Sequence, residues 1–163
     1  MIYYSYSKEV EISNLPKNIE EHAKTPLSKT AWSLLLKKYY SVFKEQLPPV
    51  TFLESGKPVI EGGYISISHS NGVVAVAFSK TNSVGIDVEL VKEVLPKTLN
   101  FLGVSEKDFF PEWTRRESLI KAFNKSALTK DLPSFVGITQ TLLVGEKKYS
   151  LSVYGKGCEI KLI

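Results

Sequence analysis

Two acidic side chains, Asp87 and Glu89, lie two residues apart in the segment Val84–Glu89. If this segment is a strand, alternate side chains lie on opposite faces, so the two carboxylates share one face while Ile86 and Val88 point into the core. Carboxylates that close repel each other, and burial raises the pKa of at least one of them, unless a cation lies between them. The same alternation is also typical of an ordinary half-buried strand whose acidic face is exposed to solvent.

A second pair of charged side chains, Glu117 and Lys121, lies in the segment Trp113–Phe123. Apolar residues recur at helical spacing along this segment, so the sequence predicts a helix. Residues four apart are neighbours on a helix surface, and an ordinary surface ion pair would account for both side chains. Glu117 could also close a capping box with Thr114, three residues earlier.

Ser68 and His69 lie close to a predicted hairpin turn. Two strand-like runs, 64–69 and 73–78, flank the Asn-Gly dipeptide at 71–72, which is the strongest short-range signal of a β-hairpin. The acidic strand follows after a short loop, so we expect the three strands to form one antiparallel meander. A histidine beside a tight turn is most often only a surface residue.

Two lysines are further candidates because of their positions. A helix is predicted over 25–46, because Thr25 can be its N-cap, a proline follows, and apolar residues recur until the prolines at 48–49. Lys29 lies near the start of this helix, where free backbone N–H groups favour an anion. Lys57 lies in a Gly-Lys-Pro turn and is expected on an exposed bend. Either lysine could simply be a solvated surface charge.

Composition limits the class of protein. The chain has 163 residues, which suits one domain, with one cysteine and two histidines, so neither an internal disulfide nor a structural zinc site is expected. Its beginning lacks a basic region followed by an apolar core, and no apolar run approaches the roughly 20 residues of a membrane span. We therefore expect a cytoplasmic protein with no membrane partner.

The charge of the chain indicates the chemistry of its partners. A net charge of +4 and a pI near 9.0 favour a polyanionic partner. The lysines are scattered and no aromatic-basic RNA-binding signature occurs, which argues against nucleic acid. A phosphorylated small molecule together with an acidic protein suits the charge better.

The remaining segments indicate an α+β chain. Strands are predicted over 135–143, 149–154 and 158–162, after the second helix. A second unit of helix and strands therefore follows the first, which indicates two similar halves.

Four motifs follow one another along the chain: Gly56–Pro58, Ile67–Ser70, Val84–Glu89 and Trp113–Ala122. In this order they resemble the 4′-phosphopantetheinyl transferase superfamily, of the surfactin-synthetase-activating (Sfp) type. The resemblance covers about 54–125, and the chain is shorter than usual for this type between Glu89 and Glu117, so it resembles a short variant. Asn124 and Ser126 stand where glycines are common.

The resemblance implies a fold and an activity. The implied fold is a single α+β domain over 1–163, a pseudo-dimer of halves at roughly 1–79 and 80–163. Each half would pack a small antiparallel sheet with a helix, and the site would lie in the cleft between the halves. The implied activity is transfer of phosphopantetheine from coenzyme A to a serine of an apo acyl or peptidyl carrier protein, releasing adenosine 3′,5′-bisphosphate. The enzyme would be a Mg²⁺-dependent holo-carrier-protein synthase, and two internal halves make a monomer the simplest expectation.

The resemblance also implies residue roles. Asp87, Glu89 and Glu117 would bind Mg²⁺, whose preference for oxygen ligands agrees with three carboxylates. Glu117 would also activate the attacking serine, and Lys121 would contact the pyrophosphate. Residues implied to hold coenzyme A are Lys29, Lys57, Ser68 and His69.

Two expectations complete the sequence-based hypothesis. Asp87→Ala or Glu117→Ala should abolish transfer and leave the fold intact, on the assumption that both acids are exposed. The alternative is a degenerate relative that binds coenzyme A or a carrier protein without chemistry, and the presence of all three acids and Lys121 argues against it.

Overall fold

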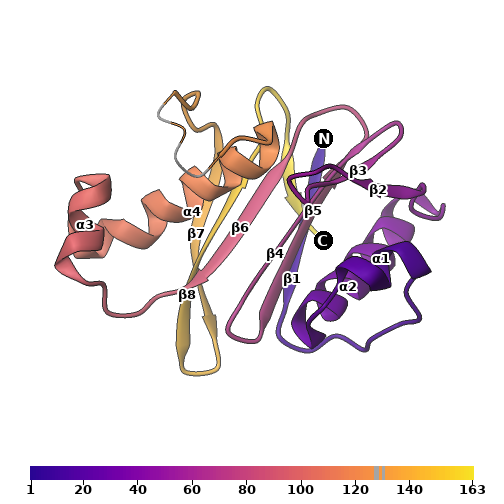
Figure 1. Cartoon of the computed structure of the whole chain (residues 1–163), viewed down its shortest axis with the longest axis horizontal. Coiled ribbons are helices and arrows are strands. Elements are labelled where there is room, and N and C mark those ends of the chain that lie inside the picture. The colour runs from indigo at the N-terminus through magenta and orange to yellow at the C-terminus, as the bar shows by residue number, and fades with distance from the viewer. Residues whose placement is uncertain (127–128, 130) are drawn as a thin grey trace.

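Helices and strands of a mixed α+β chain make up the computed structural model, which describes residues 1–126, 129 and 131–163. Two long helices flank the strands from opposite sides (Figure 1). The elements in chain order are β1 (Ile2–Ser7), α1 (Lys17–His22), α2 (Pro26–Phe43), β2 (Val50–Phe52), β3 (Pro58–Ile60), β4 (Tyr64–Ser70), β5 (Val73–Ser79), β6 (Gly85–Leu90), α3 (Pro96–Leu102), α4 (Glu106–Phe123), β7 (Gly137–Val144), β8 (Lys147–Tyr154) and β9 (Ile160–Leu162).

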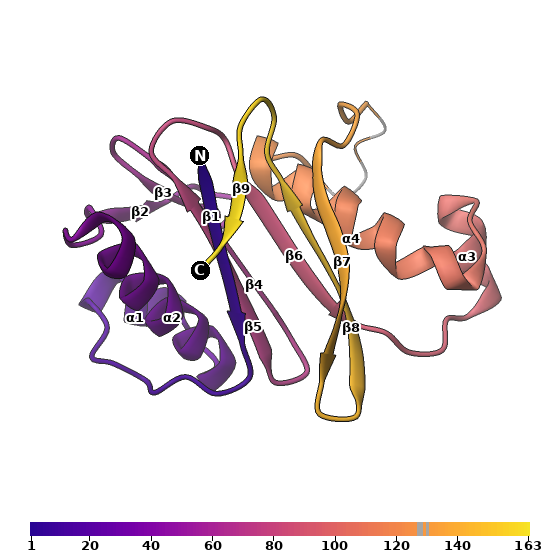
Figure 2. The same cartoon turned by 180° about the vertical axis from the view of Figure 1, so that it is seen from behind.

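The strands form two main sheets and a short ribbon. One sheet has the order β4-β5-β1-β9, the other the order β6-β8-β7, and β2 pairs with β3. The strand β9 returns to the first sheet and lies parallel to β1 (Figure 2). The expected hairpin of β4 and β5 is confirmed, with Asn71 at a positive φ in its turn.

The expected three-stranded meander is wrong. The acidic strand β6 pairs with β8 in the second sheet rather than with β5. The reason is that β5 already has neighbours on both edges, β4 on one side and β1 on the other, which leaves no free edge for β6.

Two cores hold the sheets in place. The first lies between α2 and one face of the first sheet, where Trp32, Leu35 and Phe78 are fully buried. The second lies between the two sheets and includes Ile86 and Leu151. The sheets therefore share a core while α2 covers one of them and α4 packs on the other.

The first long helix agrees with its sequence signals. The Thr25 hydroxyl accepts a hydrogen bond from the Ser28 N–H, and Pro26 occupies the first turn. The helix ends at Phe43 because Lys44 adopts a left-handed conformation, a few residues before the prolines.

The second long helix begins earlier than predicted. It starts at Glu106 rather than Trp113 and includes Pro111. Phe109 and Phe110 are buried on the core side of the first turns, so tertiary packing stabilises helix where the proline would suggest a break. Sequence patterns also missed the short elements α1, β2 and β3. None of the helices described in these residue ranges is long and apolar enough to cross a membrane.

Candidate functional site

The site forms where β6 and α4 lie next to β4. Asp87 on β6 is only 3% exposed, and its Oδ1 accepts hydrogen bonds from Ser68 Oγ at 2.9 Å and from Lys121 Nζ at 2.7 Å. Its other oxygen, Oδ2, is buried without a hydrogen-bond partner among the described residues. The assumption that Asp87 is an exposed acid is therefore wrong.

The sequence allowed two ordinary explanations of Glu117 and Lys121, a surface ion pair between them and a capping box with Thr114. The positions of the side chains test both explanations. Lys121 forms its ion pair with Asp87 on the neighbouring strand β6. Thr114 lies in the middle of α4, where its hydroxyl contacts Ser150 and Ser152, so the capping-box interpretation of Glu117 is wrong.

Glu89 and Glu117 belong to the same electrostatic cluster. Burial raises the pKa of Glu117, and the negative charge of Asp87 raises it further, while Lys121 opposes the shift. Burial also raises the pKa of Glu89, and the hydrogen bond from Ser70 acts in the opposite direction. Three carboxylates thus interact in one partly buried place, with the Lys121 ammonium group acting on both Glu89 and Glu117.

The donor set fits a hard divalent cation in its chemistry. Carboxylate oxygens are the ligands that Mg²⁺ prefers, and the unpartnered Oδ2 of Asp87 is a buried negative atom that a cation would satisfy. Within the described residues, however, no three His, Cys, Asp or Glu side chains form a group that could hold a metal ion as they lie. The acids are therefore brought together without being assembled into a closed site.

A pocket of about 440 Å³ shares Lys121 with this group of acids and is lined by lysines and aromatic rings. Lys57 Nζ donates to the Ala122 carbonyl at 2.8 Å, at the C-terminal end of α4, and burial lowers the pKa of Lys57. The turn at residues 54–56 is exposed as expected, but the Lys57 side chain itself is half-buried. The pocket is also lined by Lys121, Lys125, His22, Trp32 and Phe52.

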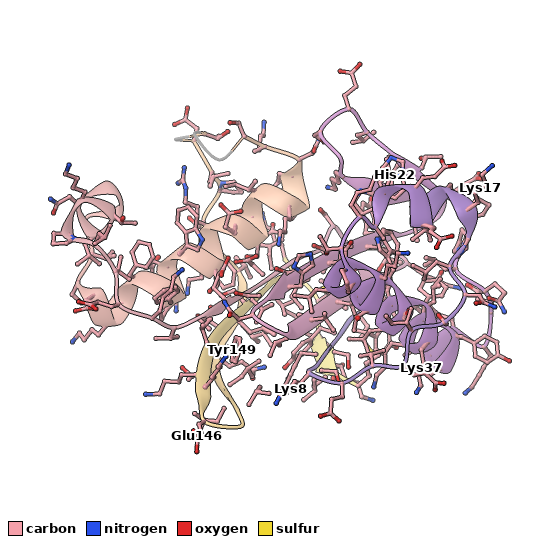
Figure 3. All side chains as sticks on the ribbon, turned by 60° about the horizontal axis from the view of Figure 1, so that its bottom comes forward. Lys8, Lys17, His22, Lys37, Glu146 and Tyr149 are labelled. Atoms are coloured by element: carbon pink, nitrogen blue, oxygen red, sulfur yellow. The ribbon has the colours of Figure 1, made fainter. Side chains whose placement is uncertain are left out.

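Sequence reasoning missed the aromatic wall of this pocket. His22 at the end of α1 stacks on Phe52 of β2 with ring centroids 3.6 Å apart, and Trp32 meets Phe52 edge-on. Figure 3 shows His22 at the helical end of the molecule that carries α1 and α2. No spacing rule links these residues, because α1 and β2 are short elements without a periodic signal. Only the fold brings them together.

The other two candidates lie in different surroundings. His69 is exposed on β4, and partial desolvation together with the charge of Lys121 lowers its pKa, so the neutral imidazole is favoured. Lys29 pairs with Glu20 at 3.2 Å and lines a separate pocket with Ser13 and Asn14. The structure therefore places His69 within the electrostatic reach of Lys121, while Lys29 lies elsewhere.

The site of this α+β protein thus combines a partly buried group of acids with a pocket lined by Lys57, Lys121 and Lys125, whose ammonium groups could hold phosphate. No family model matches the chain. It is 26% identical over 121 residues to the 4′-phosphopantetheinyl transferase AcpT of Salmonella typhi and to the protein of the same name from Salmonella typhimurium strain LT2. The match covers 60% of this chain and 63% of each relative, so it spans less than two thirds of their length. This similarity supports the 4′-phosphopantetheinyl transferase superfamily and does not distinguish the Sfp type within it.

Proposed function

We propose that this chain transfers 4′-phosphopantetheine from coenzyme A to a serine of an apo acyl or peptidyl carrier protein and releases adenosine 3′,5′-bisphosphate. The observation that carries the proposal is Asp87, a buried carboxylate with Lys121 on one oxygen and no described partner for the other. Such an atom costs free energy unless a cation binds it. The similarity to AcpT supplies the reaction class.

The chain's own residues account for the main chemical needs of this reaction. Asp87, Glu89 and Glu117 would hold Mg²⁺, which when bound neutralises charge on the pyrophosphate. Glu117 has a raised pKa and suits a general base that takes the proton from the attacking serine hydroxyl. The serine oxygen then bonds to the phosphorus of the phosphopantetheine group as the bond to adenosine 3′,5′-bisphosphate breaks. Lys121 would stabilise the negative charge of that leaving group.

Coenzyme A fits the lysine-lined pocket in charge and in character. Lys57 and Lys121 supply cations for phosphate groups, and the Phe52 and His22 rings supply an aromatic surface for a base. By the resemblance, Ser68 and His69 would also contact coenzyme A, with the neutral imidazole of His69 able to donate a hydrogen bond to a phosphate. Lys29 is assigned to coenzyme A by the resemblance alone.

The finer features of the family are part of the same proposal. They are an Sfp-type short variant, a single domain over 1–163, and a pseudo-dimer with halves near 1–79 and 80–163. In support, α2 packs on the sheet that contains β4 and β5, and α4 packs on the sheet that contains β6. A monomeric state, a cytoplasmic location and the absence of nucleic-acid partners stay predictions from the sequence.

Intact mass spectrometry tests the proposed reaction. The purified chain is incubated with coenzyme A, Mg²⁺ and a panel of apo carrier proteins, and each carrier is expected to gain one phosphopantetheine group if it is a substrate. A sample with excess EDTA is the control and should show no gain. If no apo carrier in a panel from fatty-acid, polyketide and peptide synthesis gains mass, the transferase proposal is wrong.

A second candidate function is binding of coenzyme A or a carrier protein without chemistry. The observation that favours it is the open arrangement of the acids, since no described group of three acidic or imidazole side chains is closed enough to hold a metal ion. It predicts measurable coenzyme A binding by calorimetry together with unchanged carrier masses, a combination that the first function excludes.

Removal of the Lys57 ammonium is expected to weaken coenzyme A binding. In Lys57→Ala we expect KM for coenzyme A to rise about tenfold, because a charged hydrogen bond contributes roughly 1.5 kcal/mol. The measurement is initial rate against coenzyme A concentration. Lys147→Ala, an exposed lysine at the start of β8, should leave KM unchanged. Equal KM values for both variants would contradict the assignment of the pocket.

The raised pKa of Glu117 predicts a pH-dependent effect on stability. A carboxyl whose pKa is higher in the folded than in the unfolded protein loses stabilisation as pH rises through the folded pKa. Glu117→Gln should therefore raise the thermal unfolding midpoint of the metal-free protein at pH 7. Below the ordinary Glu pKa of 4.5 both states are protonated and the difference should vanish. A variant that melts below wild type at pH 7 would show that the Glu117 carboxylate stabilises the fold.

A further inference from the structure

Three serines on one face of β4 join the two main sheets. Their side-chain oxygens accept hydrogen bonds from backbone N–H groups of β6, and each donor lies 20 residues after its serine, so the two strands run parallel. Hydroxyl groups thus take the place of main-chain carbonyls at this junction, which we call the serine seam. Its bonds run from Ile86 to Ser66 at 3.1 Å, from Val88 to Ser68 at 3.3 Å, and from Leu90 to Ser70 at 3.2 Å.

Two of the three serines have a second partner. Ser68 Oγ donates to Asp87 Oδ1 and Ser70 Oγ donates to Glu89 Oε2, both at 2.9 Å. In each case the acid stands immediately before the residue whose N–H donates a hydrogen bond to the same serine: Asp87 before Val88, and Glu89 before Leu90. At the equivalent place opposite Ser66 stands Gly85, which has no side chain. The seam therefore repeats one bridging unit, with a carboxylate in two of its three copies.

A hydroxyl group has only one hydrogen to donate. Ser68 uses it on Asp87, and Ser68 is buried, with 7% of its surface exposed. While this bond exists, Ser68 has no proton for a phosphate oxygen, which differs from the coenzyme A contact that the resemblance implies. Ser70 is committed to Glu89 in the same way.

The seam also determines which oxygen of Asp87 stays available. Ser68 and Lys121 both bind Oδ1, so the carboxylate is held with Oδ2 buried and unpartnered among the described groups. Because neighbouring units of the seam are two residues apart, both acids are held from the same side of β6. We infer that Ser68 and Ser70 are positioning residues that orient the Asp87 and Glu89 carboxylates toward a divalent cation. This inference rests on the metal site of the proposed function.

Direct Mn²⁺ binding to the full chain, without substrate, tests the role of the seam. Free Mn²⁺ is followed by its paramagnetic resonance signal during a titration. Loss of a group that orients a metal ligand typically weakens metal affinity at least about tenfold, so Ser68→Ala and Ser70→Ala should each raise Kd by about that factor. Ser70→Thr keeps the hydroxyl group on a strand position suited to a β-branched side chain, and should restore Kd to the wild-type value.

Ser66→Ala is the matched control. It removes the same kind of bridge to β6 but no contact to a carboxylate, so it should lower the unfolding midpoint as Ser68→Ala does and leave the Mn²⁺ Kd unchanged. Should Ser68→Ala fail to fold, the pair Ser70→Ala and Ser70→Thr decides the matter, because Ser70 is only half-buried.

The possible results distinguish a failure of the positioning role of the serines from a failure of the proposed transferase function. If the wild-type chain binds Mn²⁺ and neither Ser68→Ala nor Ser70→Ala raises Kd, the positioning role is wrong. The proposed transferase function is not affected by that result. A Ser66→Ala variant that weakens Mn²⁺ binding as much as the others would also overturn the positioning role, since a general loosening of the seam would then explain the effect. A wild-type chain that binds no Mn²⁺ would overturn the metal site and this inference together.

Discussion

Asp87→Asn is expected to lower the rate of phosphopantetheine transfer about a thousandfold, because several kcal/mol of charge stabilisation depend on a carboxylate at this place. Asparagine keeps the size of the side chain and can still accept a hydrogen bond from Ser68. The substitution therefore removes the charge with little change in packing. Initial rates with an apo carrier protein shown to be a substrate give the measurement.

Asp87→Asn should change the free energy of unfolding by only about 1 kcal/mol. The reason is not that Asp87 is exposed, since it is buried, but that two effects of the substitution oppose each other. Loss of the ion pair with Lys121 is unfavourable, but Lys121 is 30% exposed and can turn to water. The buried carboxylate also no longer has to be desolvated, and the two effects oppose each other. Chemical denaturation of both proteins at one pH measures the difference. Transfer by Asp87→Asn at near wild-type rate would show that the cation-binding role is wrong.

Gly85→Ala is expected to have the second large effect, through the position of α4. A Cβ atom at Gly85 would lie 1.8 Å from the Ser118 carbonyl oxygen and 2.9 Å from the Ala122 nitrogen. Both contacts are backbone atoms of α4, so the helix must move away from β6. We expect a loss of about 3 kcal/mol in unfolding free energy, the upper end for overpacking, and a roughly hundredfold loss of transfer rate because Glu117 and Lys121 move with the helix.

Gly145→Ala separates the two consequences of Gly85→Ala. Gly145 lies in the turn between β7 and β8 at φ +62°, and no atom lies within 4 Å of a Cβ built there. Alanine should cost about 1 kcal/mol from backbone strain alone. Figure 3 shows Glu146 at the far tip of this hairpin, away from α4. Transfer by the folded Gly145→Ala protein should match wild type, and an equal loss in both variants would mean that the rate reports stability rather than the position of α4.

Local signals in the sequence determined the elements that carry the site. The N-cap at Thr25, the Asn-Gly turn and the alternation around Asp87 each depend on neighbouring residues, and the observed α2, hairpin and β6 agree with them. The later strands β7, β8 and β9 were also predicted within about two residues of their observed bounds. Motif order over 54–125 indicated the superfamily that the similarity to AcpT supports.

The arrangement of those elements depended on contacts between residues far apart in the chain. The sequence could not show that β6 leaves the hairpin for a second sheet, because a free strand edge is a property of the assembled sheet. Nor could it show that Lys121 reaches across to Asp87, or that Lys57 lies on the end of α4 rather than in solvent. The sequence by itself thus determined the residue types and local conformations. Only the tertiary structure decided the partner of each charge, because burial and long-range hydrogen bonds arise when the sheets and helices pack.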